Sequence, residues 1–346
     1  MWVSSVRRRL LPPQFALMEL GTSLWPSLCL IAFARLRIAG TMMDGPKTST
    51  EIARELHLDP GALYRVLRLL AGYDVLREEP AERFSLTRLG RALSDSEDLP
   101  TAAFLRYLGE PWQLGPWVGI DETLRTGRPA FEVMYGQPFF AFLREHPAAA
   151  SIFDDAMTAV AQLHASAVRD AYDFGAAGCV ADVGGGKGVQ LGALLAANPR
   201  LRGILYDLPH VVAAATADVK MAEARGRCEC VGGDFFVRVP AGADVYLLSH
   251  ILHDWDDEAA LRILRACRSA MAPSATLLIV ECVIENGTNR WSQGHLTDLQ
   301  MLLTLGGRER TRAEFSELLG AADLGIARVL PIAAAESILE ALPLVR

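Results

Sequence analysis

The sequence has no unbroken apolar run of the roughly 20 residues that a membrane-spanning helix needs. The longest candidate, residues 24–34, is too short and ends at Arg35 and Arg37. Three arginines precede a short apolar stretch near the N-terminus, but Pro12 and Pro13 interrupt the apolar core that a secretory signal requires. We therefore expect a cytoplasmic protein with no membrane partner.

Closely spaced cysteines are also scarce. Six cysteines are spread over the 346 residues, and only Cys228 and Cys230 lie near each other. A single C-x-C pair makes neither a zinc site nor a disulfide of normal geometry. The cysteines at positions 179, 267 and 282 lie in apolar runs, which predicts buried free thiols.

An excess of basic residues is missing as well. The chain has 34 Lys and Arg against 41 Asp and Glu, which gives a net charge of −7. This balance argues against nucleic acid as the main partner. It is compatible with a cationic small ligand.

The chain contains no internal repeat and no low-complexity tract, but its periodicity changes once. Apolar residues follow a helical period up to about residue 171, and from residue 179 to about 330 strand-like runs alternate with helices. Gly175 and Gly178 mark the change. Alternating strands and helices predict an α/β fold with a parallel sheet covered on both faces.

Residues 48–90 of the helical part show a winged-helix pattern. Ser49 or Thr50 is expected to cap a helix over 51–56, Asp59 with Pro60 starts a helix over 61–70, and strands near 75–76 and 84–86 form a hairpin. DNA binding is the rival function, because Arg65 and Arg68 lie on the second helix. Acidic residues surround both arginines, so packing or dimerisation is the favoured role.

In the second part, polar residues and glycines stand where predicted strands end. Strands are predicted at 180–184, 203–208, 229–232, 244–249 and 275–283, with a closing hairpin at 326–330 and 336–342. Helices are predicted at 189–197, within 211–224, and at 256–271 and 312–321. Ligands of such sheets bind outside the carboxyl ends of the strands. The residues at these ends are Gly184, Asp207, Asp234, Ser249 and Glu281.

A glycine-rich turn at residues 181–188 opens a helix and predicts a nucleoside ligand. Asp207 ends the next apolar run, at the spacing of a carboxylate that accepts hydrogen bonds from a ribose. Leu191 occupies the third glycine position of a dinucleotide motif, and no Lys-Ser/Thr pair makes a P-loop. A ribose without a pyrophosphate, as in S-adenosylmethionine, fits better. Asp234 and Phe235 are the candidates for the adenine.

His253 is the candidate for proton chemistry. It follows the core strand 244–249 and precedes an Asp-rich helix start, at the ligand-facing edge of the sheet. Glu281 ends the neighbouring strand in sequence, and Glu309 stands just before the next helix. A carboxylate beside an imidazole makes it a stronger base and fixes its tautomer.

Five segments bear on the family. They are Asp-Val-Gly-Gly-Gly from Asp182, Tyr-Asp-Leu-Pro from Tyr206, Gly-Gly-Asp-Phe-Phe from Gly232, Leu-His-Asp-Trp-Asp-Asp from Leu252 and Gly-Gly-Arg-Glu-Arg-Thr from Gly306. Over nearly the whole chain the sequence resembles the S-adenosylmethionine-dependent O-methyltransferases of the plant caffeate/isoflavone type and their bacterial relatives in aromatic antibiotic and phenazine biosynthesis.

This resemblance implies a Rossmann-like methyltransferase domain with a mostly parallel, seven-stranded sheet. It implies a dimerisation domain at residues 1–110, linking helices that line the acceptor pocket at 111–174 and a catalytic domain at 175–346. The chain is then expected to form a homodimer through its N-terminal helices. The cofactor-binding residues implied are Asp182, Gly184, Gly185, Gly186, Asp207, Leu208, Gly233, Asp234, Phe235 and Ser249, and the catalytic residues are His253, Glu281 and Glu309.

The implied reaction is methylation of a phenolic hydroxyl on a small aromatic natural product. The sulfonium activates the methyl group without a metal, so no metal is expected. A phenol has a pKa of about 10 against about 6.5 for free histidine, so His253 would remove the proton as the methyl bond forms. The acceptor candidates are Phe153, Met157, Trp255, Asp298, Met301 and Leu302.

Three alternatives stay open at this point. The first is a methyltransferase-like protein that catalyses decarboxylation or hydroxylation. The second is methylation of a nitrogen, because an amine acceptor can use the same pocket. The third is a transcription regulator that uses the winged helix.

Overall fold

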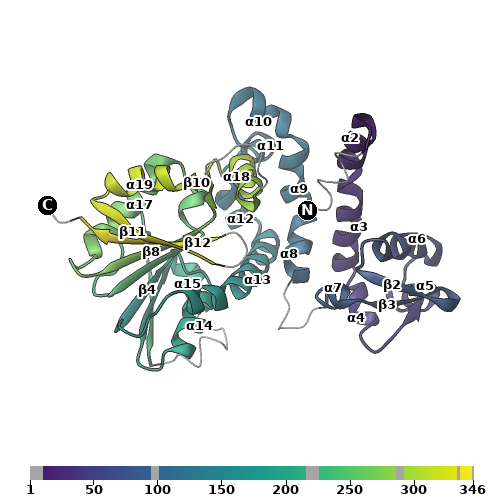
Figure 1. The fold of residues 1–346 in the computed structure, drawn as a ribbon, viewed down its shortest axis with the longest axis horizontal. Coiled ribbons are helices and arrows are strands. Elements are labelled where there is room, and N and C mark those ends of the chain that lie inside the picture. The colour runs from purple at the N-terminus through teal and green to yellow at the C-terminus, as the bar shows by residue number, and fades with distance from the viewer. Residues whose placement is uncertain (1–10, 95–100, 216–225, 286–291, 333–335, 345–346) are drawn as a thin grey trace. The chain divides into compact units, whose positions relative to one another are not determined.

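The computed structural model describes residues 11–94, 101–215, 226–285, 292–332 and 336–344 (Figure 1). The chain divides into two compact units. The first comprises Met1–Leu114 with Ser151–Ala159, and the second comprises Gly115–Ala150 with Val160–Arg346. The domain boundaries expected near residues 110 and 174 stay predictions.

The first unit is mostly helical and contains a small antiparallel sheet of order β1-β3-β2. Its core includes the buried side chains of Phe33, Ile52, Leu67 and Phe84. Its elements are α2 (Pro13–Thr22), α3 (Leu24–Arg35), α4 (Ile38–Thr41), β1 (Lys47–Thr48), α5 (Ser49–Leu56), α6 (Pro60–Ala71), β2 (Leu76–Glu79), η1 (Pro80–Glu82), β3 (Arg83–Leu86), α7 (Arg88–Arg91) and α8 (Thr101–Leu108).

The winged-helix prediction is confirmed in its elements and corrected in one cap. Asp59 caps α6, as predicted. Helix α5, however, begins at Ser49, and Thr48 is its cap. The Thr48 hydroxyl accepts a hydrogen bond from the Glu51 N–H at 3.2 Å, and the Glu51 carboxylate accepts one from the Thr48 N–H at 2.7 Å. This reciprocal pair is a capping box, which satisfies two N–H groups that a bare helix start leaves unpaired.

Helices α2 and α3 are separated only by Ser23, and both are rich in apolar residues. Over Pro13–Arg35, 23 residues, this segment is long and apolar enough to cross a membrane by length and composition alone, and 6% of its most apolar window is buried within the chain. The segment is longer than the sequence predicts, because helical conformation begins at Pro13 rather than near residue 24. Exposed apolar helices of this kind also pack against partner proteins.

The second unit is built on a seven-stranded sheet of order β11-β12-β8-β7-β4-β5-β6. Strands β4 to β8 are parallel, and the hairpin of β11 and β12 adds to β8 in antiparallel register. These strands are β4 (Cys179–Val183), β5 (Arg202–Asp207), β6 (Cys228–Gly232), β7 (Val245–Ser249), β8 (Thr276–Glu281), β11 (Leu324–Pro331) and β12 (Ser337–Pro343).

Helices cover both faces of this sheet. Helices α9 (Pro111–Val118) and α13 (Pro147–Ala171) each contain residues assigned to both units. The others are α10 (Ile120–Thr126), α11 (Ala130–Tyr135), α12 (Phe139–Glu145), α14 (Val189–Ala197), α15 (Pro209–Ala215), η2 (Leu252–Asp254), α17 (Asp257–Ala270), α18 (Gln293–Thr304) and α19 (Arg312–Gly320).

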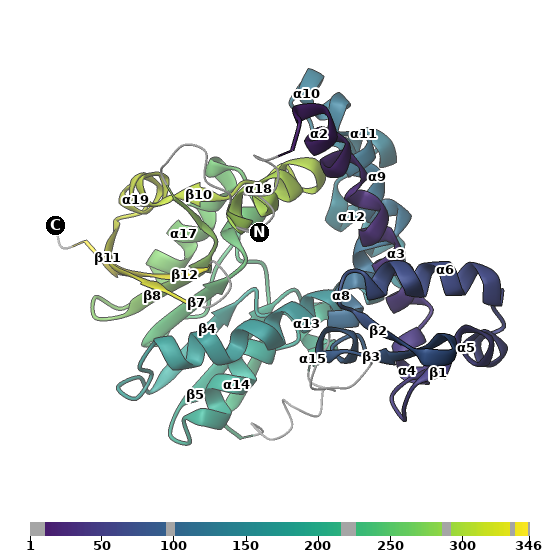
Figure 2. The ribbon, with the colours of Figure 1, turned by 45° about the vertical axis from the view of Figure 1, so that its right-hand side comes forward.

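The alternation of side chains along the strands produces two cores. Leu248 of β7 faces α17 and α19, where it belongs to the cluster that includes Ile263 and Phe315. Its neighbour Leu247 faces the opposite side, in the cluster that includes Leu191 of α14. Figures 1 and 2 show α17 and α14 on opposite faces of the sheet. A sheet covered on both faces leaves its strand ends as the place for ligands.

The predicted α/β order of strands and helices is confirmed. The helix expected within 211–224 is present as α15 from Pro209, and residues 216–225 of that prediction lie outside the described residues. The six cysteines are free thiols, and Cys179, Cys267 and Cys282 are buried as predicted.

One predicted strand is corrected in a way that matters for the site. The run 275–283 divides into β8 and a two-residue strand β9 (Val283–Ile284). Strand β9 pairs in parallel with β10 (Arg310–Thr311), outside the main sheet. This pairing brings the segment that carries Glu309 beside the end of β8.

Candidate active site

The turn between β4 and α14 has the backbone conformation that its glycines allow. Gly184 has a φ of 76° and Gly186 a φ of 57°, a left-handed region that side chains other than glycine rarely adopt. A Cβ on Gly184 would lie 2.5 Å from the Ile251 Cδ1 atom, whereas nothing lies within 4 Å of a Cβ on Gly186. The turn therefore offers bare backbone with open space over Gly186.

Two carboxylates lie under this turn. The Asp207 carboxylate accepts hydrogen bonds from the Gly186 N–H at 2.8 Å and from the Leu208 N–H at 2.6 Å, which fixes its orientation at the end of β5. Asp182 is 1% exposed, and its Oδ2 has no hydrogen-bond partner among the described residues. A Cβ on Gly185 would lie 2.6 Å from the Asp182 Cγ, so glycine is needed there too.

Burial dominates the electrostatics of these carboxylates. Burial, with the nearby charge of Asp207, raises the pKa of Asp182 to about 7. Burial also raises the pKa of Asp207, against the opposing effect of its two backbone hydrogen bonds. Removal of a carboxylate from water disfavours its charged form, and a cationic ligand nearby reverses that effect.

The loop after β6 approaches the same turn. Asp234 is exposed, and its Oδ1 accepts a hydrogen bond from the Phe236 N–H at 2.8 Å. The Phe235 ring reaches within 3.6 Å of the Cβ position of Gly184. Gly233 packs on Tyr206, whose hydroxyl oxygen would lie 2.3 Å from an added Cβ. The candidates for the adenine thus lie beside the glycine-rich turn.

His253 contacts two carboxylates through one ring nitrogen. It lies in η2, directly after β7, and its Nδ1 is 2.9 Å from Glu309 Oε1 and 3.1 Å from Glu281 Oε2. Its Nε2 lies 3.5 Å from Asp254 Oδ1. The side chains of Glu281 and Glu309 are 0% and 1% exposed, against 13% for His253. The structure therefore brings the three predicted catalytic residues together.

Glu281 also holds the backbone around His253. Its Oε1 accepts from the N–H groups of Ile251 at 3.1 Å, Leu252 at 2.8 Å and His253 at 3.3 Å. Glu309 is held in turn by Asp298 of α18, whose Oδ1 accepts from the Glu309 N–H at 2.9 Å. The His253 ring is thus held between two carboxylates that are themselves fixed, and we call His253, Glu281 and Glu309 the His253 frame.

This frame makes His253 a strong base. Burial alone would lower the pKa of His253, but the charge of Glu281, the hydrogen bond to Glu309 and the charge of Asp254 raise that pKa to about 10. Burial raises the pKa of Asp254 to about 7 and also raises the pKa of Glu281. At neutral pH the ring is therefore mostly protonated, and only its small neutral fraction can accept a proton.

Sequence reasoning missed two residues that support this frame. Arg310 is 0% exposed, and its guanidinium donates to the carbonyl oxygens of Leu252 at 2.8 Å and Trp255 at 2.9 Å. Gly307 packs against the turn so closely that a Cβ would lie 2.1 Å from the His253 carbonyl oxygen. The signal was present in the Gly-Gly-Arg-Glu-Arg-Thr segment, in which the predictions gave a role to the glutamate alone.

The acceptor candidates lie in different surroundings. Trp255 packs edge-on against Phe236 with ring centroids 4.8 Å apart, and Phe140 stacks on Trp255 at 6.2 Å. Met301 and Leu302 are half-buried on α18, the helix of Asp298. Phe153 and Met157 belong to the first unit, where Phe153 packs against Tyr107. Contact of these residues with an acceptor stays a prediction.

Ser249 ends β7, where its hydroxyl lies 3.3 Å from Nδ1 of His250. His250 has a φ of 55°, a left-handed conformation that is unusual for a residue other than glycine. A role of Ser249 in binding a cofactor also stays a prediction.

Comparison with protein families identifies both parts of the chain. Residues 117–324 match a family model described as the O-methyltransferase domain, and residues 18–96 match the O-methyltransferase dimerisation domain. The phenazine O-methyltransferase of Lysobacter antibioticus is 40% identical over 334 residues, which cover 96% of this chain and 97% of that protein.

The names of two further relatives describe other reactions. The 8-amino-8-demethylriboflavin N,N-dimethyltransferase of Streptomyces davaonensis is 36% identical and covers 91% of each chain. The aclacinomycin 10-hydroxylase of Streptomyces purpurascens is 37% identical over 90% of this chain and 84% of that protein.

Solved structures agree with this assignment. The mitomycin 7-O-methyltransferase superposes with a TM-score of 0.87 at 34% identity and covers 96% of this chain and 98% of that one. An O-methyltransferase from neocarzinostatin biosynthesis, solved with S-adenosylmethionine and 2-hydroxy-5-methyl naphthoic acid, has a TM-score of 0.76 at 34% identity and covers 92% of this chain and 96% of that one.

We predict that Gly307→Ala destabilises the fold by about 1–3 kcal/mol, because the new methyl group collides with backbone atoms of the turn that carries His253. Gly320→Ala is the matched control, since nothing lies within 4 Å of its Cβ position at the end of α19. Urea unfolding of both variants measures the difference. Equal stability of the two would show that the turn is not tightly packed on Gly307.

Proposed function

Because the chain belongs to the O-methyltransferase family, we propose that it methylates a phenolic hydroxyl of a small aromatic natural product, with S-adenosylmethionine as donor and His253 as general base. The single observation that carries this proposal is the pair of contacts from His253 Nδ1 to Glu309 and Glu281, at 2.9 Å and 3.1 Å. These contacts raise the pKa of His253 to about 10, which is close to the pKa of a phenol.

The residues around the glycine-rich turn fit S-adenosylmethionine. The turn of Gly184 and Gly186 exposes backbone beside the orphaned Oδ2 of buried Asp182. Such an oxygen suits a positively charged ligand with N–H groups. Asp207 has spare lone pairs for ribose hydroxyls, because each carboxylate oxygen accepts one backbone N–H. Asp234 and Phe235 would hold the adenine.

The bound sulfonium supplies an electrophilic methyl group. The task left to the chain is to orient an acceptor hydroxyl and to take its proton. A phenol has a pKa of about 10, and the pKa of His253 is also about 10, so proton transfer between them is nearly balanced. Glu309 and Glu281 stabilise the imidazolium as it forms. Alignment of the reacting groups supplies further rate enhancement, up to about 7–11 kcal/mol.

The name of the Lysobacter relative, a phenazine O-methyltransferase, supports a hydroxyl acceptor on an aromatic molecule. The N,N-dimethyltransferase and the 10-hydroxylase represent the two alternatives, methylation of nitrogen and a reaction other than methyl transfer. An amine acceptor needs the same alignment but less help from a base, since many amines react without loss of a proton before attack. Hydroxylation or decarboxylation would leave the donor's methyl group untransferred. Mass spectrometry of the product distinguishes these reactions, because only methyl transfer adds 14 mass units per methyl group and yields S-adenosylhomocysteine.

We predict that His253→Ala lowers kcat for a phenolic acceptor by roughly a hundred- to ten-thousandfold, the usual contribution of a general base. The affinity for S-adenosylhomocysteine, measured by calorimetry, should stay unchanged because the glycine-rich turn is intact. His295→Ala is the control, since His295 is exposed on α18. Undiminished transfer by the His253 variant would remove this residue from the mechanism.

The pH dependence of the reaction tests the role of Glu309. His253 is protonated below a pKa of about 10, so kcat/KM should rise with pH from 7 toward 10. Glu309→Gln removes the negative charge that stabilises the imidazolium and replaces one of two acceptor oxygens by a donor, so the pKa of His253 falls. The rise should then occur at lower pH, and the limiting rate should be smaller because the base is weaker.

The measurement uses EDTA-treated enzyme and two phenols of different acidity, so that ionisation of the acceptor is separated from that of the enzyme. Glu317→Gln, an exposed residue on α19, is the control and should keep the profile of the unmodified protein. A profile of Glu309→Gln that coincides with that control would contradict the proposed role.

We also propose that the chain forms a homodimer through the first unit. The family model for residues 18–96 is that of a dimerisation domain. Helices α2 and α3 expose large apolar side chains, among them Leu17 at 69% and Trp25 at 63%. Exposure of these apolar side chains to water is unfavourable, and the packing of two such helices would bury them. A cytoplasmic location, with no membrane and no nucleic acid as partner, is part of the same proposal.

Light scattering tests the dimer. We predict a dimer for the unmodified chain and a monomer, or a dimer at least about tenfold weaker, for the double variant Leu17→Lys and Trp25→Lys, because two charges enter an apolar interface. Val237→Lys replaces an equally exposed apolar residue of the second unit (76% exposed) and should leave the dimer intact. A stable monomer of the unmodified chain would refute the proposal.

A further inference from the structure

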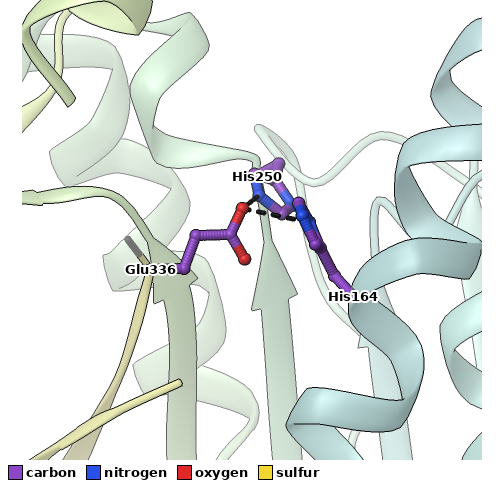
Figure 3. A group of neighbouring side chains, drawn as sticks. All are labelled: His164, His250 and Glu336. Carbon is purple, nitrogen blue, oxygen red and sulfur yellow. Dashed lines mark hydrogen bonds and ion pairs between the residues drawn. The ribbon is translucent and has the colours of Figure 1, made fainter. Parts of the chain in front are cut away.

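A second group of histidines and a carboxylate lies beside the His253 frame and has no part in the proposed reaction. His164 comes from α13, His250 follows the last residue of β7, and Glu336 precedes β12. Figure 3 shows their side chains pointing toward one another from these three segments. His250 Nε2 lies 2.7 Å from Glu336 Oε1, and His164 Nδ1 lies 3.0 Å from the same oxygen.

Hydrogen bonds within the described residues do not satisfy this group. His164 Nδ1 lies close to Glu336 Oε1 but makes no hydrogen bond, and Glu336 Oε2 also lacks a partner. The Glu336 side chain is 4% exposed and that of His164 is 16% exposed, so bulk water does not compensate fully. Buried polar atoms without partners are uncommon and call for an explanation.

The donor atoms have the chemistry and spacing of a metal site. One ligand atom from each of the three residues lies within 4.8 Å of the other two. Imidazole nitrogen and carboxylate oxygen are the usual ligands of zinc and similar ions, at about 2.0–2.2 Å. Ligand atoms around such an ion are then roughly 2.8–3.1 Å apart in octahedral and 3.3–3.6 Å apart in tetrahedral coordination. The observed separations of 2.7 Å and 3.0 Å lie at the short end of these values, so an ion would need the side chains to move apart by a few tenths of an ångström at most in an octahedral site.

We propose that His164, His250 and Glu336 bind a divalent transition-metal ion of the zinc and cobalt class. Two nitrogens and one oxygen leave at least one coordination position for water or another ligand. Such an ion would give both unsatisfied atoms, His164 Nδ1 and Glu336 Oε2, a positively charged neighbour. The side chain of His250 is 25% exposed, which provides a route for the ion to enter.

The His253 group also brings three donor atoms together, but it is the weaker candidate. It offers one imidazole nitrogen, whereas the group of His164, His250 and Glu336 offers two. One oxygen of Glu281 already accepts three backbone N–H groups. The two groups share no residue, although the rings of His250 and His253 are neighbours with centroids 5.7 Å apart. Variants of each group can therefore separate them.

The experiment uses the untagged full chain, stripped with EDTA and dialysed. Cobalt(II) is titrated while its visible absorption is followed, and zinc binding is measured by calorimetry. The unmodified chain should bind one equivalent, with cobalt bands typical of nitrogen and oxygen ligands. Glu336→Gln and His164→Gln should each weaken binding at least about tenfold, since even loss of a supporting contact outside the ligand shell costs that much.

Two controls keep the result interpretable. Glu309→Gln alters the other group, and His295→Ala removes an exposed histidine, so both should bind the ion as the unmodified chain does. Circular dichroism checks that every variant is folded, and the milder Glu336→Gln decides the matter if a histidine variant is not. Absence of uptake by the unmodified chain, or uptake that survives Glu336→Gln but is lost in Glu309→Gln, would overturn the proposal. None of these readouts depends on methyl transfer.

Discussion

The site depends on the interactions of one group, the carboxylate of Glu281 at the end of β8. One of its oxygens accepts three successive N–H groups of the turn that follows β7, and the other faces the ring of His253. A single buried charge therefore shapes the turn and strengthens the base that the turn carries. Its burial is tolerable because those N–H groups and the imidazolium replace the water that the carboxylate loses.

The parallel sheet explains why such distant segments meet. The carboxyl ends of β4, β5, β7 and β8 share one edge, so the glycine-rich turn, Asp207, His253 and Glu281 come together although they lie far apart in the sequence. The pairing of β10 with β9 then brings Glu309, the residue before β10, to this edge. The glycine-rich turn and His253 are thus held by the same edge of one sheet.

The sequence was sufficient for the order of strands and helices, because apolar periodicity and glycine positions are local signals. It also placed Glu281 and Glu309 near His253, although that grouping came from a family resemblance. It was insufficient for Arg310, whose burial depends on carbonyl groups more than fifty residues away. The cap at Thr48 was missed for a simpler reason, since three neighbouring hydroxyl residues are equivalent until the backbone conformation is known. The group of His164, His250 and Glu336 has no spacing that a sequence pattern could detect.

The hydrogen bond from Glu309 to Asp298 links the position of Glu309 to helix α18. Asp298 lies on α18 beside Met301 and Leu302, and it holds the backbone of Glu309. If α18 contacts the acceptor, a substitution that reshapes its surface to admit a new molecule also shifts the anchor of Glu309. Selectivity and turnover then cannot be tuned separately through this helix. Laboratory evolution of new acceptors should find its freest positions on other helices.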